Sequence, residues 1–167
     1  AALALVGCDQ PATAPATPLA SALLPDGAPT GVSAAIRAGG PGRVIAFHDE
    51  WALANHSFEK STGSPQYARN VARFFAPGRA GRFLAWSDNV GLRGDSVATT
   101  MRASGHAWVH TTVRDLALDD LKRFDAVFVG GGIVPSADLL DAYVQAGGGV
   151  YVMGGTGETP GGSPAHE

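Results

Sequence analysis

The stretch that decides the fold runs from Phe124 to Glu158 and reads FDAVFVGGGIVPSADLLDAYVQAGGGVYVMGGTGE. It opens with a short apolar run, breaks at three glycines, and continues with apolar residues at helical spacing. A second glycine break at 147–149, a second apolar run at 150–153 and a third glycine-rich loop complete it. This succession predicts one strand–helix–strand crossover, the unit from which parallel sheets are built.

The same alternation precedes this stretch. Short runs of apolar, β-branched and aromatic residues predict further buried strands at 43–47, 83–86 and 107–109. Apolar residues at helical spacing predict helices over about 65–76 and about 96–104, each with polar or proline start signals at its beginning. The pattern is therefore strand and helix in regular alternation along most of the chain.

Five short strands that alternate with helices predict a three-layer α/β fold with a doubly wound, mainly parallel five-stranded sheet. Right-handed crossovers favour a flavodoxin-like strand order. The last predicted strand has no helix after it, because residues 159–167 are rich in Gly and Pro. We therefore expect residues 42–158 to be the folded domain and 159–167 to be a tail at which the fold is truncated.

The N-terminal segment has the features of an exported, anchored protein. Residues 1–7 resemble the end of a lipoprotein signal peptide, and Leu5-Val6-Gly7-Cys8 resembles the lipobox in which the cysteine becomes lipidated. Residues 8–41 are rich in Ala, Pro, Gly and Thr without sustained periodicity, which predicts a flexible tether. We expect lipidation at Cys8, a membrane anchor and an extracytoplasmic location in the bacterial cell envelope.

Composition excludes several function classes. The formal charge is −3 and no basic run occurs, which argues against a nucleic-acid partner. Cys8 is the single cysteine, so neither an intramolecular disulfide nor a multi-cysteine metal site can form. No nucleotide-binding fingerprint is complete, because the glycine-rich loop after 150–153 lacks the Lys and Ser/Thr of a P-loop. We expect no cofactor and no metal.

Polar and glycine residues follow the predicted strands, and in doubly wound sheets ligands bind at the carboxyl ends of strands. These segments should converge on one rim, where their side chains can bind a ligand or simply form solvated loops with tight turns. Trp51 and Trp86 near this rim can stack on a sugar or belong to the core. The candidate ligand-binding residues are His48, Asp49, Glu50, Trp51, Ser87, Asp88, Asn89, Gly130, Gly131, Gly154, Gly155 and Thr156.

The run 124–156 resembles the core of the class I glutamine-amidotransferase-like superfamily, including its ThuA-like members and the related domain of intraflagellar transport proteins. The resemblance rests on FDAVF before a glycine turn, YVQAGGG, and VYVMGG. Catalytic members carry a cysteine at the elbow after the last of these strands. The matching position here is Thr156 or its neighbour Gly155, and no cysteine is near it. The resemblance therefore implies the fold without the nucleophile.

Three functions follow from these observations. The first is a catalytically inert envelope lipoprotein domain that binds a carbohydrate-like small molecule or a protein partner at the rim. The second is a hydrolase that uses Asp49, Glu50 and Asp88 as acid and base, with or without the assistance of a metal ion. The third is a structural module of a larger envelope protein.

Overall fold

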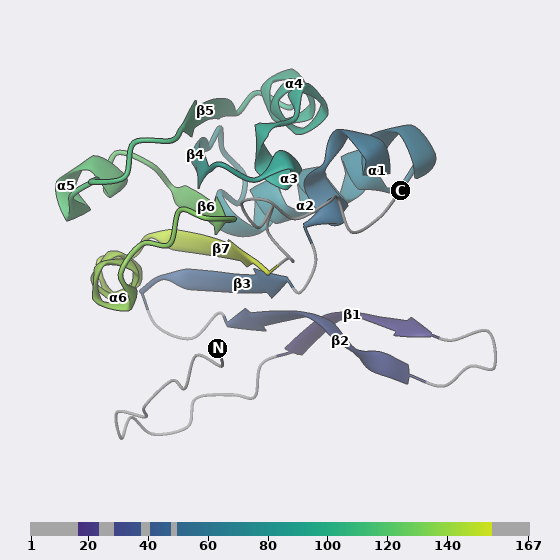
Figure 1. The fold of residues 1–167 in the computed structure, drawn as a ribbon, viewed down its shortest axis with the longest axis horizontal. Coiled ribbons are helices and arrows are strands. Elements are labelled where there is room, and N and C mark those ends of the chain that lie inside the picture. Colours follow the sequence, from purple (N-terminus) through teal and green to yellow (C-terminus); the bar gives the residue numbers. More distant parts are fainter. Residues whose placement is uncertain (1–16, 24–28, 38–40, 48–49, 155–167) are drawn as a thin grey trace.

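The computed structural model of the chain describes residues 17–23, 29–37, 41–47 and 50–154, the first two ranges through their backbone. Its centre is a seven-stranded sheet with the order β1-β2-β3-β7-β6-β4-β5 (Figure 1). The five strands from β3 to β5 in this order are parallel to one another. Their bounds are β3 Arg43–Phe47, β4 Arg82–Ser87, β5 Ala107–Thr111, β6 Ala126–Gly130 and β7 Gly149–Met153.

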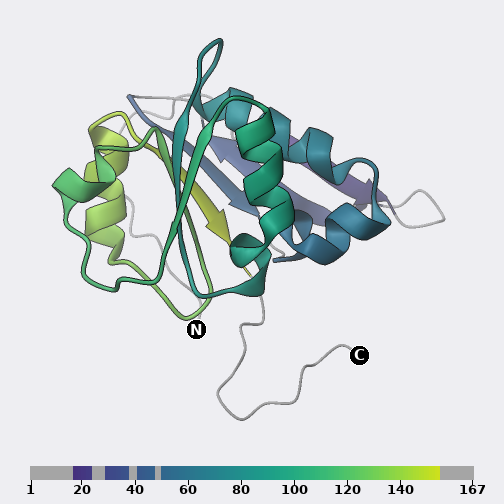
Figure 2. The ribbon, with the colours of Figure 1, turned by 90° about the horizontal axis from the view of Figure 1, so that it is seen from above.

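Helices cover both faces of the sheet, as the two perpendicular views show (Figures 1 and 2). One face carries η1 (Trp51–Leu53), α1 (Asn55–Lys60), α2 (Ser64–Phe75), α3 (Val90–Arg93) and α4 (Asp95–Ala103). The other carries α5 (Leu118–Leu121) and α6 (Ala137–Gln145). Each face has its own apolar cluster, centred on Phe128 on the α2 side and on Trp86 and Val127 on the α6 side.

The predicted three-layer α/β fold with five parallel strands is confirmed. The flavodoxin-like order is not found. If the five parallel strands β3, β4, β5, β6 and β7 are renumbered 1 to 5 along the chain, their order across the sheet is 3-2-4-5-1, whereas the flavodoxin order is 2-1-3-4-5. β3 lies beside β7 at the edge of the parallel part, with Arg43 opposite Gly149. Hydrophobic periodicity identifies strands but does not determine which strands are neighbours, because both orders bury the same residues.

A hairpin lies within the segment 8–41, for which the sequence predicted a flexible tether. β1 (Thr17–Leu23) pairs antiparallel with β2 (Pro29–Arg37), and β2 pairs antiparallel with β3. The pairing with β1 has several register shifts, which is typical of an edge strand. The edge of β3 offers unpaired backbone N–H and C=O groups, and the hairpin forms hydrogen bonds with them. This pairing does not require the regular apolar pattern by which a strand is identified in a sequence.

The stretch 124–154 forms the predicted crossover, with β6, α6 and β7 in succession. Ser136 caps α6, because its Oγ accepts a hydrogen bond from the backbone N–H of Leu139 at 3.2 Å. Gly147 ends the helix with φ +97°, a conformation that favours glycine. β7 then returns parallel to β6 and β3 and is the middle strand of the seven-stranded sheet.

The topology places a switch point between β4 and β6, which are neighbours in the sheet. The chain leaves β4 over the face of α3 and α4 to reach β5, and it leaves β6 over the face of α6 to reach β7. The two connections therefore diverge from adjacent strand ends toward opposite faces. Such a divergence opens a crevice outside the carboxyl ends, where ligands of doubly wound proteins bind.

Candidate functional site

A pocket of about 720 Å³ lies at this switch point. Its size falls within the range of about 300–1,000 Å³ that small-molecule sites usually have. The segments that follow β4, β5 and β6 contribute to it, together with the start of α1. The lining residues are Asn55, Asp88, Asn89, Val90, Arg93, Gly94, Arg114, Gly131 and Gly132.

The loop after β4 is held rigidly. Ser87 is fully buried, and its Oγ donates a hydrogen bond to the carbonyl of Gly130 at 2.7 Å. The same oxygen accepts the backbone N–H of Asn89 at 3.0 Å. Asn89 in turn caps α3, because its Oδ1 accepts the N–H of Gly91 at 2.7 Å. These bonds lock the loop to the end of β6 and fix the direction of the Asp88 side chain.

Asp88 ties the two sides of the switch point together. Its Oδ1 accepts a hydrogen bond from the backbone N–H of Gly132 at 2.7 Å. Gly131 has φ +84°, and a Cβ at that position would lie 2.4 Å from the same oxygen. The turn after β6 therefore needs glycine at 131 both for its backbone conformation and for the close approach of Asp88.

Two further side chains join the α1 side to this wall. The Asn89 amide Nδ2 donates a hydrogen bond to Glu50 Oε2 at 2.9 Å. Asn55 Oδ1 accepts the backbone N–H of Ser96 at 3.0 Å and so caps the first turn of α4. The predicted acid Glu50 is thus attached to the loop after β4 but does not line the pocket itself.

Arg93 and Arg114 provide the positive charge of the pocket. Arg93, at the end of α3, donates only a long hydrogen bond of 3.4 Å to the Asp88 carbonyl. Within residues 41–47 and 50–154, ion pairs join Arg79 to Asp125 and Lys122 to Asp119, and neither includes a residue of the pocket. Both arginines are exposed, and both line the same pocket as Asp88.

The structure brings part of the predicted rim together. Ser87, Asp88, Asn89, Glu50, Gly130 and Gly131 form the connected wall described above. Gly154 lies apart from the pocket, and its N–H donates to the carbonyl of Phe47 at 2.7 Å. The predicted residues Cys8, His48, Asp49, Gly155 and Thr156 lie outside the described residues.

The structure shows where the two tryptophans predicted to lie near this rim are located. Trp86 is 1% exposed, and its Nε1 donates a hydrogen bond to the carbonyl of Val113, so it belongs to the core and cannot stack on a sugar. The reason is that β4 is an inner strand covered on both faces. Trp51 is 37% exposed in η1, stands edge-on to His56 at 5.4 Å and does not line the pocket.

The histidines at the two ends of β5 have structural partners. His106 Nδ1 accepts the N–H of Gly81 at 2.9 Å, and burial lowers the pKa of its imidazole although Asp125 acts in the opposite direction. His110 Nε2 lies 2.8 Å from the carbonyl of Ser87, so this nitrogen carries the proton. His110 thereby anchors the end of β4 from the neighbouring strand.

The sequence alone did not identify Asn55, Val90, Arg93, Gly94 and Arg114 as pocket residues. Arg114 follows the carboxyl end of β5 by three residues, and Arg93 follows that of β4 by six. Both arginines follow strands that end on the shared rim, and this position in the sequence could have indicated that they lie near the pocket. Asn55 gave no such signal, because it lies at the start of α1, eight residues after the end of β3.

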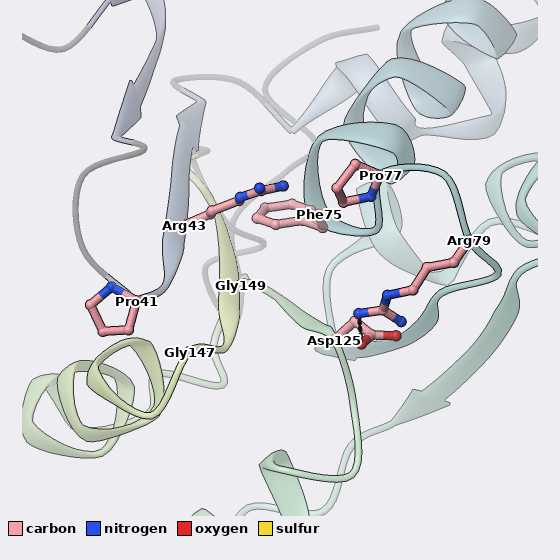
Figure 3. A pocket seen from close by; sticks show the side chains of 8 residues that line it. All are labelled: Pro41, Arg43, Phe75, Pro77, Arg79, Asp125, Gly147 and Gly149. Atoms are coloured by element: carbon pink, nitrogen blue, oxygen red, sulfur yellow. Dashed lines mark hydrogen bonds and ion pairs between the residues drawn. The ribbon is translucent and has the colours of Figure 1, made fainter.

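A second, smaller pocket of about 260 Å³ lies at the opposite end of the sheet (Figure 3). Arg79 pairs there with Asp125 at 2.6 Å, and Asp125 Oδ2 also accepts the N–H of Arg82 at 2.7 Å. Arg43 extends over the ring of Phe74, to whose carbonyl it donates a hydrogen bond. The Asp125 contacts hold the amino end of β4 next to that of β6, and the Arg43 contacts join the amino end of β3 to the end of α2. We therefore assign this pocket a structural role.

Two negative findings concern the part of the chain that the structure describes. In that part, no group of three or more His, Cys, Asp or Glu side chains could hold a metal ion. Within the same residues, no helix has the length and apolar character required to cross a membrane.

No protein-family model matches the sequence, and no curated protein matches it either. Similar solved structures are those of IMPa. The IMPa of Pseudomonas aeruginosa in complex with an O-glycopeptide matches with a TM-score of 0.57 and 14% identity over 83% of this chain. The IMPa metallopeptidase in complex with T-antigen matches with a TM-score of 0.55 and 15% identity, also over 83% of this chain. The likeness is one of fold. This chain spans about 16% of the length of either protein.

Proposed function

We propose that this protein is a non-catalytic binding domain whose ligand, a carbohydrate-like small molecule or the glycan of a partner, occupies the pocket between β4 and β6. The observation that carries the proposal is the pocket itself, with its position at the switch point and its polar lining. Planar amide, carboxylate and guanidinium groups can each bond adjacent hydroxyl groups of a sugar.

The rigidity of the wall supports binding without catalysis. Asp88 and Glu50 each accept a structural hydrogen bond from a neutral donor, Gly132 N–H and Asn89 Nδ2 respectively. A prearranged wall of this kind lowers the entropy cost of ligand binding. The similar IMPa structures contain an O-glycopeptide and T-antigen, and the presence of a glycan there is in keeping with a carbohydrate ligand here.

The test is a titration of the full 167-residue chain, labelled with ¹⁵N, against glucose, galactose and their N-acetylamino forms. We expect the amide signals of Gly131 and Gly132 to shift saturably with at least one of these sugars. If these four sugars, glucuronate and glucose 6-phosphate all leave both signals unchanged at concentrations of tens of millimolar, the proposed function is wrong.

A matched pair of variants locates the binding. Val90 lines the pocket and is 51% exposed, so Val90→Trp fills the cavity without disturbing the core. Val134 is 79% exposed and lies outside the pocket, so Val134→Trp adds the same bulk elsewhere. We expect Val90→Trp to abolish the sugar-dependent shifts and Val134→Trp to retain them.

A hydrolase is the second candidate, because the Glu50 carboxylate is bonded to Asn89, the neighbour of Asp88 in the loop after β4. The similar structures also include metallopeptidases. In that case Glu50→Gln or Asp88→Asn should abolish turnover of a glycoside or glycopeptide while the variant still unfolds cooperatively. Full turnover in both variants would remove these carboxylates from any mechanism.

For the location of the domain, we propose that a lipid on Cys8 holds it at the bacterial cell envelope. The motif Leu5-Val6-Gly7-Cys8 supports this proposal, as does the Ala/Pro-rich segment after it. The intact mass of the native protein, extracted from membranes, should include a diacylglyceryl or triacyl increment on Cys8. A mass without any lipid increment would contradict it.

A further inference from the structure

We propose that the ligand of the pocket between β4 and β6 is acidic, a sugar that carries an oxyanion held by Arg93 and Arg114. This inference rests on the proposed function and adds a charge requirement to it. The two arginines come from separate elements, the end of α3 and the segment after β5, and both line the same cavity.

Three arginines outside the pocket make structural contacts. Arg79 pairs with Asp125, Arg43 donates to the Phe74 carbonyl, and Arg102 donates to the Trp108 carbonyl. Each of these three is committed to a structural contact. Arg93 has only its 3.4 Å bond, and Arg114 forms no hydrogen bond or ion pair with any residue of 41–47 or 50–154. The uncommitted guanidinium groups therefore include both arginines of the pocket.

The carboxylate of the pocket does not neutralise them. Asp88 accepts the Gly132 N–H and forms no ion pair with a described residue. The lining therefore has two positive groups and one negative group, on a chain whose formal charge is −3. A local excess of positive charge on an acidic protein attracts an anionic ligand specifically to this place. Guanidinium groups bond carboxylate, sulfate and phosphate groups in bidentate fashion.

The inference is tested with three ligands that differ at one carbon: glucose, glucuronate and glucose 6-phosphate. The full 167-residue chain is titrated with each, and the amides of Gly131 and Gly132 serve as the readout. We expect at least one of the acids to bind about tenfold more tightly than glucose. Glucuronate or glucose 6-phosphate as the preferred acid identifies a carboxylate or a phosphate as the recognised group.

Arg114→Gln should remove this preference. Arg123 is an exposed arginine just before β6, at the opposite end of the sheet, so Arg123→Gln makes the same charge change outside the pocket and should retain the preference. If glucose and both acids bind equally, or if Arg114→Gln keeps the preference, the inference is overturned while the proposed function stands. If none of the three sugars and none of the earlier panel shifts the pocket amides, both are overturned.

Discussion

Asn89 donates a hydrogen bond from its side-chain amide to Glu50 Oε2 at 2.9 Å and so joins the loop after β4 to the segment after β3. The Asn89 residue is 7% exposed, and its other amide atom, Oδ1, accepts the Gly91 N–H. Both polar ends of one buried side chain are therefore used to hold the wall of the pocket.

Asn89→Asp should weaken this wall, because it replaces the donor to Glu50 with a second carboxylate. We expect a loss of about 1–3 kcal/mol in the free energy of unfolding, measured in urea. The double variant Glu50→Gln/Asn89→Asp restores a donor–acceptor pair with the polarity reversed and should recover most of that loss. Equal stability of Asn89→Asp and the wild type would show that this bond does not contribute.

Gly131→Ala should be more destabilising than an equivalent change at another glycine with positive φ. Gly105 has φ +83° and no heavy atom within 4 Å of an added Cβ, so Gly105→Ala reports backbone strain alone, about 1–2 kcal/mol. At Gly131 the added Cβ also meets Asp88 Oδ1 at 2.4 Å and Asn89 Cβ at 2.8 Å. Thermal unfolding of the two variants should therefore show the larger decrease in Tm for Gly131→Ala, together with loss of sugar binding.

Asp125→Asn should make stability less sensitive to acid. Burial raises the pKa of the Asp125 carboxyl, but hydrogen bonds from Arg79 and from the Arg82 N–H, with the charges of both arginines, lower it further than burial raises it. Because the folded-state pKa is depressed, the ion pair stabilises the protein above the unfolded-state pKa of about 4, and this stabilisation is lost as the pH falls through the folded-state value.

We expect Asp125→Asn to cost about 1 kcal/mol at pH 7, a small value because Arg79 is half exposed and screened by solvent, and almost nothing near pH 2. Urea unfolding at both pH values measures this difference. The other ion pair supplies the control: the Asp119 side chain is 92% exposed, so Asp119→Asn should cost nothing at either pH. A cost for Asp125→Asn that does not change with pH would argue against the ion pair as its source.

Tyr67 should make the fold sensitive to alkali. Burial raises the pKa of its hydroxyl to about 12, although the hydrogen bond with the Tyr151 hydroxyl at 3.1 Å acts in the opposite direction. A raised folded-state pKa means that this group's contribution is complete below about pH 10 and is lost as the pH rises toward 12. Tyr67→Phe should flatten that part of the pH–stability curve, and absorbance at 295 nm should show fewer tyrosines ionised at pH 11 than in the unfolded chain.

The class of the fold was predictable from the sequence, because it depends on short-range patterns. The apolar runs at 83–86 and 126–129 and the helical spacing in 137–145 each predict a local structure, and their alternation predicts a parallel sheet covered on both faces. The polar residues that follow β4 could also be predicted to lie on a shared rim, since parallel strands end on the same edge.

The tertiary structure decided what no local pattern contains. It placed β3 beside β7, put the switch point between β4 and β6, and paired a hairpin with the edge of β3. It buried Trp86 within an inner strand and brought Asn55, Arg93 and Arg114 from three segments into one cavity. The physical reason is that periodicity reports which side of an element faces the core, whereas neighbours across the sheet depend on contacts between residues distant in sequence.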